Sequence, residues 1–470
     1  MVIVGRDDGV TGSYTRRLSE FCSSLNYESI PPRIIHRAKW AVLDTLGIIL
    51  GASATLEGKR IANFVRELRD KKEATAIGFA FKSSVRNVAF LNGTLSEMLE
   101  LQDGYSKGGI HPCCGVISST LAMAEYHHRG GKELLTSIIV GYEVANRVSE
   151  AIHPSHLGRG FQPTGTVGAI GGAAATGKLI GFDKNQMFNS IGIAGYILPI
   201  STGDNLYGGY SIKPVHGGAA ARAGIESAML AKIGLTACSL EGTTGLNKGF
   251  CAIVSDKPNY GKITEGLGEK YTIEEVYIKP YACCRINHPA VEIVLDLLAR
   301  HQFKPEDIED ILIKTYTFAA SVPGQIRPNP SSYFIHGQFS MPYCVAVALI
   351  DGQVGLEQFN PEKIKDQRIH QLADRIKVLA DIEMDRLRPA NRPALVEINL
   401  KSGQKLTGRV DYPKGDSRKP LSEEEMLKKF EDLASHTLSL KRVKKVGSLV
   451  LDLEKINDVR EMVKKCFEKK

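Results

Sequence analysis

Five short segments of this chain combine side chains that can carry or exchange a proton with residues that begin helices. In the segment 213–222, Lys213 and a proline precede His216, which is followed by a run of glycine and alanine. Small residues let a helix backbone approach a neighbour closely, and the N–H groups and dipole of a helix start favour an anion. The segment therefore predicts a pocket for a small anion.

Four further segments have a related composition. They are Glu100–Tyr105 with His111-Pro112, Arg159–Thr166, Cys283–Pro289 and Phe339–Tyr343. Four of the five segments place a protic side chain just before or at a predicted helix N-terminus, where a carboxylate is stabilised. Taken together they predict a carboxylate site with proton-transfer groups.

The elements that must position these segments follow from the apolar pattern. From about residue 15 to residue 235, apolar residues recur at spacings of three and four, which is typical of helices. The predicted helices are Ile34–Leu50, Val85–Leu99, Val116–Tyr126, Glu133–Ile152, Gly165–Leu179, Lys184–Ala194 and Ala219–Ala231.

The pattern changes after about Tyr271. Predicted strands are Thr272–Ile278, Ile311–Thr317 and Ile376–Ile382, with a hairpin of Ala394–Leu400 and Lys405–Asp411. Helices are predicted at His288–Arg300 and Gly337–Ile350, and a capping box at Ser422–Glu425 opens a further helix. We expect a mainly α protein: a large, discontinuous, all-helical domain (residues 1–272 and 413–470) interrupted by a smaller α+β domain (residues 273–412).

Composition narrows the function classes. The 470 residues carry 60 Lys and Arg against 52 Asp and Glu, without a basic stripe interleaved with aromatics, so nucleic acid is not an expected partner. No apolar run is long enough for a membrane span. The nine cysteines form no CxxC pair and no ligand set has zinc spacing, so we expect a cytoplasmic protein with free thiols and no metal.

One motif has the spacing of a nucleotide-binding loop but lacks its other features. Gly172–Lys178 has the spacing of a phosphate-binding loop, which would suggest a nucleotide-dependent enzyme. Leu179 stands where Ser or Thr would hold magnesium, and no apolar strand precedes the glycines. We interpret the segment as part of a closely packed helix.

The motifs HP at His111, KPVHGGAA, CRINHPA and FSMPY, in this order along the chain, resemble the MmgE/PrpD family over essentially the whole chain. The resemblance implies a cofactor-independent, metal-free homodimer with a helical domain, a smaller lid domain and an active site between them. It implies that His111, Lys213, His288 and Tyr343 are functional residues. Members of this family include 2-methylcitrate dehydratase, cis-aconitate decarboxylase and iminodisuccinate epimerase.

The chain departs from the family at two places. The acidic run before the HP loop reads Glu100-Leu-Gln-Asp103-Gly, and Gln162 stands where members often have histidine. Glutamine can bind a carboxylate but cannot exchange a proton near neutral pH.

We assign roles from the chemistry of proton removal beside a carboxylate, which needs a base and cationic or N–H groups where charge develops. His111 or His288 would be the general base or acid, Lys213 and Arg285 would hold carboxylates, and Tyr343 would act on the opposite face. Asp103 and Glu100 would orient a histidine or a substrate hydroxyl, and Gln162 and His216 would bind substrate. Each of these side chains could instead serve only packing, capping or an ion pair.

The expected function is that of a lyase acting on a small di- or tricarboxylate. Dehydration of the 2-methylcitrate type comes first, with cis-aconitate decarboxylation and iminodisuccinate epimerisation as alternatives, because all three transfer a proton next to a carboxylate. A different class remains open: a catalytically silent carboxylate-binding protein, which would bind such compounds without consuming them.

Overall fold

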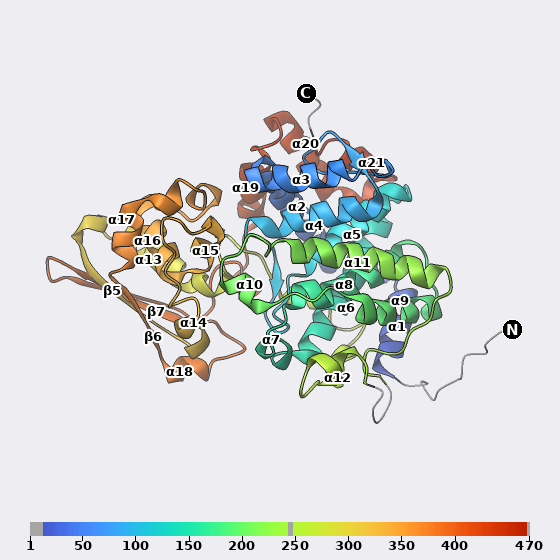
Figure 1. Ribbon diagram of the computed structural model, residues 1–470, viewed down its shortest axis with the longest axis horizontal. Coiled ribbons are helices and arrows are strands. Elements are labelled where there is room, and N and C mark those ends of the chain that lie inside the picture. Colours follow the sequence, from blue (N-terminus) through green and yellow to red (C-terminus); the bar gives the residue numbers. More distant parts are fainter. Residues whose placement is uncertain (1–12, 243–247, 468–470) are drawn as a thin grey trace.

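The computed structural model describes residues 13–242 and 248–467 and has two parts (Figure 1). A large helical body contains the N-terminal half and the C-terminal helices, and a smaller part with a β-sheet projects from one side. The predicted fold class, mainly α with a smaller α+β domain, is confirmed. The exact boundaries at residues 272 and 412 stay predictions. Residues 1–12, 243–247 and 468–470 of the predicted helical domain lie outside the described residues.

The helical body is built around α8 (Pro163–Leu179), which packs mainly against four helices. These are α5 (Pro112–Tyr126), α6 (Gly131–Ile152), α9 (Lys184–Ile197) and α11 (Val215–Lys232). Close approach needs small residues: a Cβ on Gly224 of α11 would lie 2.8 Å from the carbonyl carbon of Gly172. The segment Gly172–Lys178 is thus helical and closely packed, as interpreted from the sequence.

The remaining N-terminal helices surround this core. They are α1 (Tyr14–Ser24), α2 (Pro32–Ala54), α3 (Leu56–Glu67), α4 (Val85–Met98), α7 (Ser155–Gly158), α10 (Gly203–Tyr207) and α12 (Phe250–Val254). A hairpin of two short strands, β1 (Ala74–Thr75) and β2 (Lys82–Ser83), lies beside α4.

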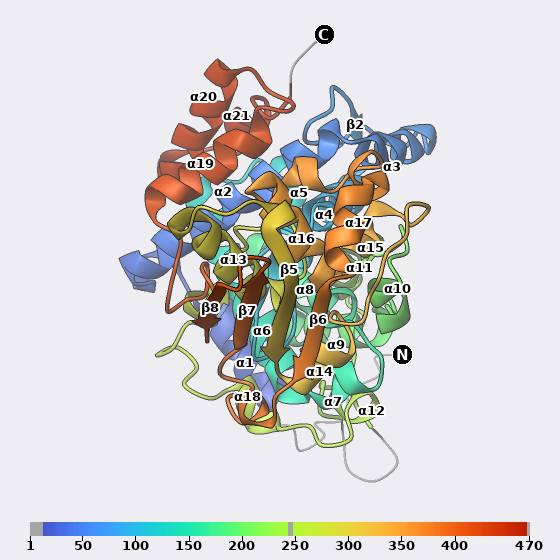
Figure 2. The same ribbon diagram turned by 90° about the vertical axis from the view of Figure 1, so that its left-hand side faces the viewer.

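The α+β part has a four-stranded sheet in the order β6-β5-β7-β8. The strands are β5 (Ile308–Thr315), β6 (Ile376–Ala380), β7 (Ala394–Leu400) and β8 (Lys405–Val410). β5 and β6 are parallel, while β5–β7 and β7–β8 are antiparallel. The helices are α13 (His288–Arg300), α14 (Thr317–Ser321), α15 (Phe334–Phe339), α16 (Met341–Asp351), α17 (Gln367–Ala373) and α18 (Ile382–Asp385). Figure 2 shows this sheet with α13 and α16 beside it.

The chain then returns to the helical body through α19 (Glu423–Ala434), α20 (Leu440–Leu451) and α21 (Arg460–Val463). Ser422 and Glu425 form the predicted capping box. α19 packs on α2, where Phe430 lies so close that a Cβ on Gly47 would be 3.2 Å from its ring.

Two predicted elements differ from the structure. The strand expected at Thr272–Ile278 is a 3₁₀ turn (Thr272–Glu275) followed by the short β4 (Val276–Tyr277), which pairs with β3 (Gly104–Tyr105) of the helical body. The helix expected at Gly337–Ile350 is interrupted at Ser340, whose hydroxyl accepts a hydrogen bond from the N–H of Tyr343 and caps α16. Period counting misses such a cap because the apolar spacing continues across it.

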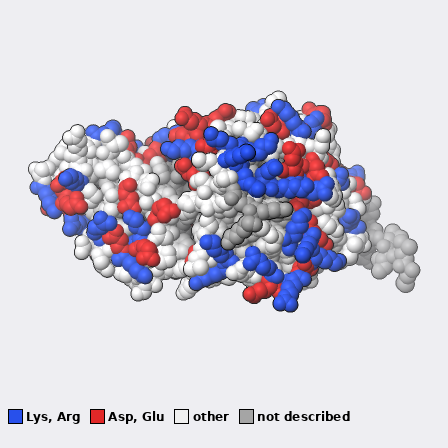
Figure 3. Space-filling model, turned by 90° about the horizontal axis from the view of Figure 1, so that it is seen from above, with Lys and Arg blue, Asp and Glu red and all other residues white. Residues whose placement is uncertain are grey.

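Two surface properties bear on partners. Among the described residues, no single helix has the length and apolar composition of a membrane span, although the bent pair α2 and α3 together meets these criteria. On the face in Figure 3, Lys and Arg side chains are interspersed with Asp and Glu.

Candidate active site

A cavity of about 360 Å³ lies between the helical body and the α+β part. The helical body contributes Glu97, Glu100, His111, His153, Gln162 and His216, and the α+β part contributes Arg285, Tyr316, Phe339, Arg388 and Arg392. Five of the nine predicted site residues therefore line it.

Helix ends bring the side chains of the helical body together. His111 and Gln162 are the residues that precede α5 and α8, each followed by a proline in the first turn, and His216 lies in the first turn of α11. α11 approaches α4 through glycines: a Cβ on Gly217 would lie 2.8 Å from the carbonyl oxygen of Gly93. The small residues after His216 thus serve helix packing, and this packing places His216 next to Glu97.

Two buried glutamates at the C-terminal end of α4 line the cavity on the side of the helical body. Glu97 accepts hydrogen bonds from Lys213 Nζ at 2.7 Å and His216 Nε2 at 2.9 Å. Glu100 accepts from Lys213 and, at 2.7 Å, from Lys279 Nζ. Lys213 and Lys279 are buried behind the cavity surface, so they do not offer free cations to a ligand.

The directions of the pKa shifts indicate that Glu97, Glu100 and Lys213 are ionised. Burial alone would raise the pKa of Glu100, but Lys213 and Lys279 outweigh it and lower the pKa to about 2. The pKa of Glu97 is also lowered, because Lys213, His111 and His216 outweigh burial. The two carboxylates in turn raise the pKa of Lys213 above its ordinary value against the effect of burial. The helical wall is a charge-compensated network at neutral pH.

Glu100 has a left-handed backbone conformation with φ of 54°. This conformation costs a non-glycine residue about 1–2 kcal/mol. The position directly follows the last residues of α4, where glycine is the usual choice. A glutamate here is retained against that cost by the two lysines that converge on its carboxylate.

His111 is held in one tautomer. Its Nδ1 lies 2.5 Å from the backbone carbonyl oxygen of Asp103, which can only accept, so Nδ1 carries the proton and Nε2 has the free lone pair. Burial and the nearby Lys279 lower the pKa of His111 to about 4. At neutral pH this imidazole is therefore uncharged and able to accept a proton.

The α+β side of the cavity has a different character. Arg285 is fixed by the carbonyl oxygens of Lys414 and Pro413 and lies over the ring of Tyr277 at 4.7 Å. Burial and the neighbouring Arg392 lower the pKa of Arg285 to about 10, so it stays charged. Arg388 and Arg392 add two more guanidinium groups, and the wall is cationic.

Comparison with known proteins gives the family. The chain matches the MmgE/PrpD N-terminal domain over residues 16–262 and the MmgE/PrpD C-terminal domain over residues 281–455. This chain belongs to the MmgE/PrpD family. It is 27% identical to a cis-aconitate decarboxylase of Aspergillus terreus, with 97% of this chain and 96% of the relative covered. It is 26% identical to a cis-aconitate decarboxylase of Homo sapiens, with 95% and 93% covered.

Besides Lys213, three of the predicted site residues do not line the cavity. Tyr343 is buried within the α+β part, called the lid from here on, against Phe359 and His370. His288 is also buried: its Nε2 lies 3.1 Å from the carbonyl oxygen of Cys283, and its Nδ1 lies 3.2 Å from Arg285 Nη1. The lid motif FSMPY contributes Phe339 to the cavity in place of its tyrosine.

Asp103 is the third of these residues. Its carboxylate accepts hydrogen bonds from Tyr142 Oη at 2.5 Å and from the N–H of Cys113 at 3.3 Å. Burial raises the pKa of Asp103 to about 6. In this structure the backbone carbonyl of Asp103 contacts His111 and the ring of His288 contacts Arg285, while neither side chain lines the cavity.

Gln162, which replaces a common family histidine, faces the cavity, and its Nε2 is buried without a hydrogen-bond partner. This amide N–H₂ can donate to a ligand oxygen but cannot supply or remove a proton. The predicted substrate-binding role of Gln162 stays a prediction that this geometry supports.

Sequence reasoning missed Glu97, His153, Lys279, Arg388 and Arg392. One signal was available, because the tripeptide Ile-Lys-Pro occurs at both 212–214 and 278–280, and the two lysines converge on Glu100. Glu97 and Glu100 are also three residues apart at a helix end, which places both on one face. Arg388 and Arg392 lie in an irregular segment before β7 that carries no periodic signal.

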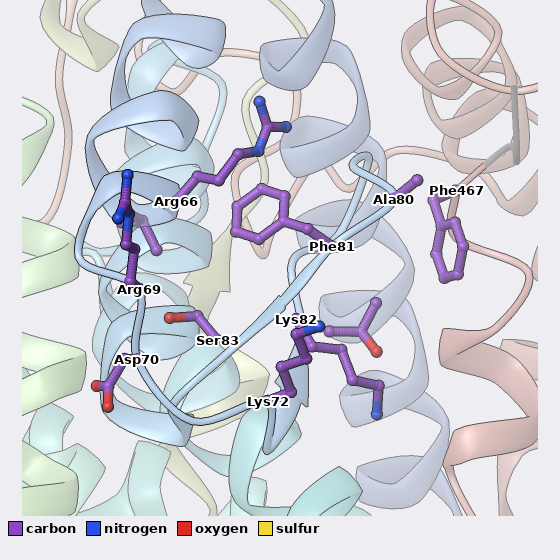
Figure 4. Close-up of a pocket in the computed structure, with 11 residues that line it drawn as sticks. Arg66, Arg69, Asp70, Lys72, Ala80, Phe81, Lys82, Ser83 and Phe467 are labelled. Carbon is purple, nitrogen blue, oxygen red and sulfur yellow. The ribbon is translucent and has the colours of Figure 1, made fainter.

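A second, larger cavity of about 810 Å³ lies between α3, the β1–β2 hairpin and the C-terminal segment (Figure 4). Two of its four basic side chains have partners: Arg66 donates to Asn63 and lies over the ring of Phe81, and Lys82 pairs with Glu125. None of the predicted site residues lines it. Elsewhere in residues 13–242 and 248–467, no three His, Cys, Asp or Glu side chains are arranged to hold a metal ion.

Proposed function

We propose that this MmgE/PrpD lyase decarboxylates a small unsaturated tricarboxylate, with cis-aconitate as the first compound to test. The observation that carries the proposal is the cavity itself, in which three histidines and an unpartnered amide on one wall face three arginines on the other. The names of the relatives favour decarboxylation over the dehydration that the sequence analysis put first.

The chemistry balances without a further reactant. The bond between the CH₂ carbon and its carboxylate breaks and CO₂ leaves. The released electron pair forms a new double bond, and the pair of the old double bond takes a proton at the carbon beside a retained carboxylate. The enzyme must hold the retained carboxylates, stabilise the developing charge and deliver that proton.

The described residues can divide these tasks. Arg285 is charged and faces the cavity, so it can hold a carboxylate by a forked pair of hydrogen bonds. His111 can relay the proton, because its Nε2 is free to accept one and a doubly protonated imidazole of low pKa gives it up readily. His216, oriented by Glu97, is a second histidine within the same cavity.

Proton NMR in D₂O of the EDTA-treated protein tests it. With cis-aconitate we expect loss of the olefinic signal, appearance of two vinylidene signals and deuterium in the product, while 2-methylcitrate and an iminodicarboxylate stay unchanged. His111→Gln should lower the rate by about 10²–10⁴-fold. His301→Gln, a lid histidine outside the cavity, is the matched control and should keep the rate.

Other outcomes select the alternatives. Loss of water from 2-methylcitrate with cis-aconitate inert would replace decarboxylation by dehydration. Proton exchange without release of CO₂ or water would indicate an epimerase. If no compound changes while several raise the melting temperature, the protein is a carboxylate binder.

A further inference from the structure

The lid wall of the cavity carries more positive charge than the cavity's own acids can balance. Arg285, Arg388 and Arg392 line it, and the acids that line it, Glu97 and Glu100, already bind Lys213 and Lys279. Two lysines and two glutamates cancel, so the three guanidinium groups remain.

Other carboxylates near these arginines are engaged elsewhere. Asp416 lies 4.0 Å from Arg285 Nη2 but accepts a hydrogen bond from Arg418 Nε at 2.8 Å. Asp385, near Arg388, accepts from the N–H and the hydroxyl of Thr317. A ligand with several negative charges would supply the missing compensation.

Unpartnered polar atoms in the cavity indicate where a negatively charged group of the ligand would bind. Arg388 Nη1 and Arg392 Nε are buried donors without a partner, and Nδ1 of His153, which donates in one neutral tautomer and accepts in the other, has no partner either. Both guanidinium groups are held in place by other contacts: Arg388 lies over the ring of Tyr316 at 4.7 Å, and Arg392 Nη1 donates to Ser106 at 2.5 Å. A buried donor without a partner costs free energy, so fixed donors of this kind point to a missing acceptor.

The charges also act on one another. Burial and then Arg392 lower the pKa of Arg388, and burial followed by Arg392 and Arg388 lowers the pKa of His153 to about 4. An anion at this place would relieve the repulsion between the two guanidinium groups and would favour the protonated form of His153.

We propose that Arg388, Arg392 and His153 form a second carboxylate subsite beside that of Arg285, which makes the cavity selective for tricarboxylates over dicarboxylates. The inference rests on the proposed function in taking carboxylates as the ligands. His153 ends α6 in the helical body, whereas the two arginines lie between α18 and β7 of the lid. The subsite thus spans both parts of the molecule, and a tricarboxylate bound there is held by groups from both.

Isothermal titration calorimetry with tricarballylate, a saturated tricarboxylate, and glutarate, its dicarboxylate analogue without the central carboxylate, tests the subsite. Loss of a buried charged hydrogen bond should raise the Kd for tricarballylate by about 30-fold in Arg388→Gln and in Arg392→Gln. The Kd for glutarate should change by less than about 3-fold, because it can bind without this subsite.

Controls separate binding from folding. Arg386→Gln removes the same charge from the same segment, where the side chain is exposed and paired with Glu383, and should leave both Kd values unchanged. Arg388→Lys keeps the charge but loses the fork, so its loss of affinity should be smaller. Circular dichroism of each variant must match the parent protein.

The outcomes are distinct from those of the proposed function. Equal Kd changes for both ligands, no change, or a parent protein without preference for tricarballylate would overturn the subsite. A parent protein that binds tricarballylate with the expected pattern yet converts no substrate would keep the subsite and overturn the decarboxylase. Turnover of cis-aconitate by the parent protein, together with unchanged selectivity in Arg388→Gln, would keep the decarboxylase and overturn the subsite.

Discussion

The two walls of the cavity use their charged residues in opposite ways. On the helical wall, Glu97 and Glu100 are matched by Lys213, Lys279 and His216, all within hydrogen-bond distance. On the lid wall, Arg285, Arg388 and Arg392 face the cavity without a comparable set of carboxylates.

This difference indicates that the two walls serve different tasks. Compensated charges fix the relative positions of α4, α11 and the β4 segment, because removing any partner leaves a buried charge. Uncompensated charges destabilise the free protein slightly and become favourable only when an anion binds. We infer that the helical wall holds the histidines in place and that the lid wall supplies affinity.

The largest expected effect breaks the helical wall. Lys213→Met leaves two buried carboxylates without their shared cation and should lower the free energy of unfolding by about 3–5 kcal/mol. Arg388→Gln removes a cation from the lid wall and should change it by less than about 1 kcal/mol, because it also removes repulsion. Urea unfolding of both variants measures the contrast. Equal losses in the two variants would show that the walls do not differ in this way.

The second prediction uses pH. The folded pKa of Glu100 is about 2 against an ordinary value of 4.5, so its ion pairs stabilise the fold above about pH 4.5. That contribution is lost as the pH falls toward 2. The stability gap between the parent protein and Glu100→Gln should therefore be largest near neutral pH and shrink below pH 4.5 in urea titrations. Glu309→Gln, at an exposed site, should show no such trend, and a gap that stays constant with pH would contradict the assignment.

Much of this organisation could be predicted from the sequence because it rests on local patterns. Helix periodicity, the change of pattern near Tyr271 and the helix-start positions of His111 and His216 follow from residue types within a few positions. The lid residues could not be predicted in the same way. His288 and Tyr343 have the expected sequence context, yet their direction depends on how α13 and α16 pack on the sheet.

The partners that complete the site are also distant in sequence. Lys279 reaches Glu100 across 179 positions, and Lys213 reaches it across 113. Only the fold brings such groups together, and no period or spacing encodes the distance between them. The unmatched arginines were missed for a related reason, since an excess of charge can be recognised only after the paired charges have been identified.

The smallest expected effect concerns His288, which supports the lid wall without reaching the cavity. Burial and Arg285 lower the pKa of His288 well below its ordinary value, so its neutral Nδ1 accepts a hydrogen bond from Arg285. In His288→Phe this acceptor is lost, and KM for the substrate should rise about 5-fold through a loosened Arg285 while kcat stays within about 2-fold. His288→Gln restores an acceptor and should recover part of the loss. His370→Phe, another lid histidine off the cavity, is the matched control. A large fall in kcat with unchanged KM would instead assign His288 to the chemical step, as the sequence motif first suggested.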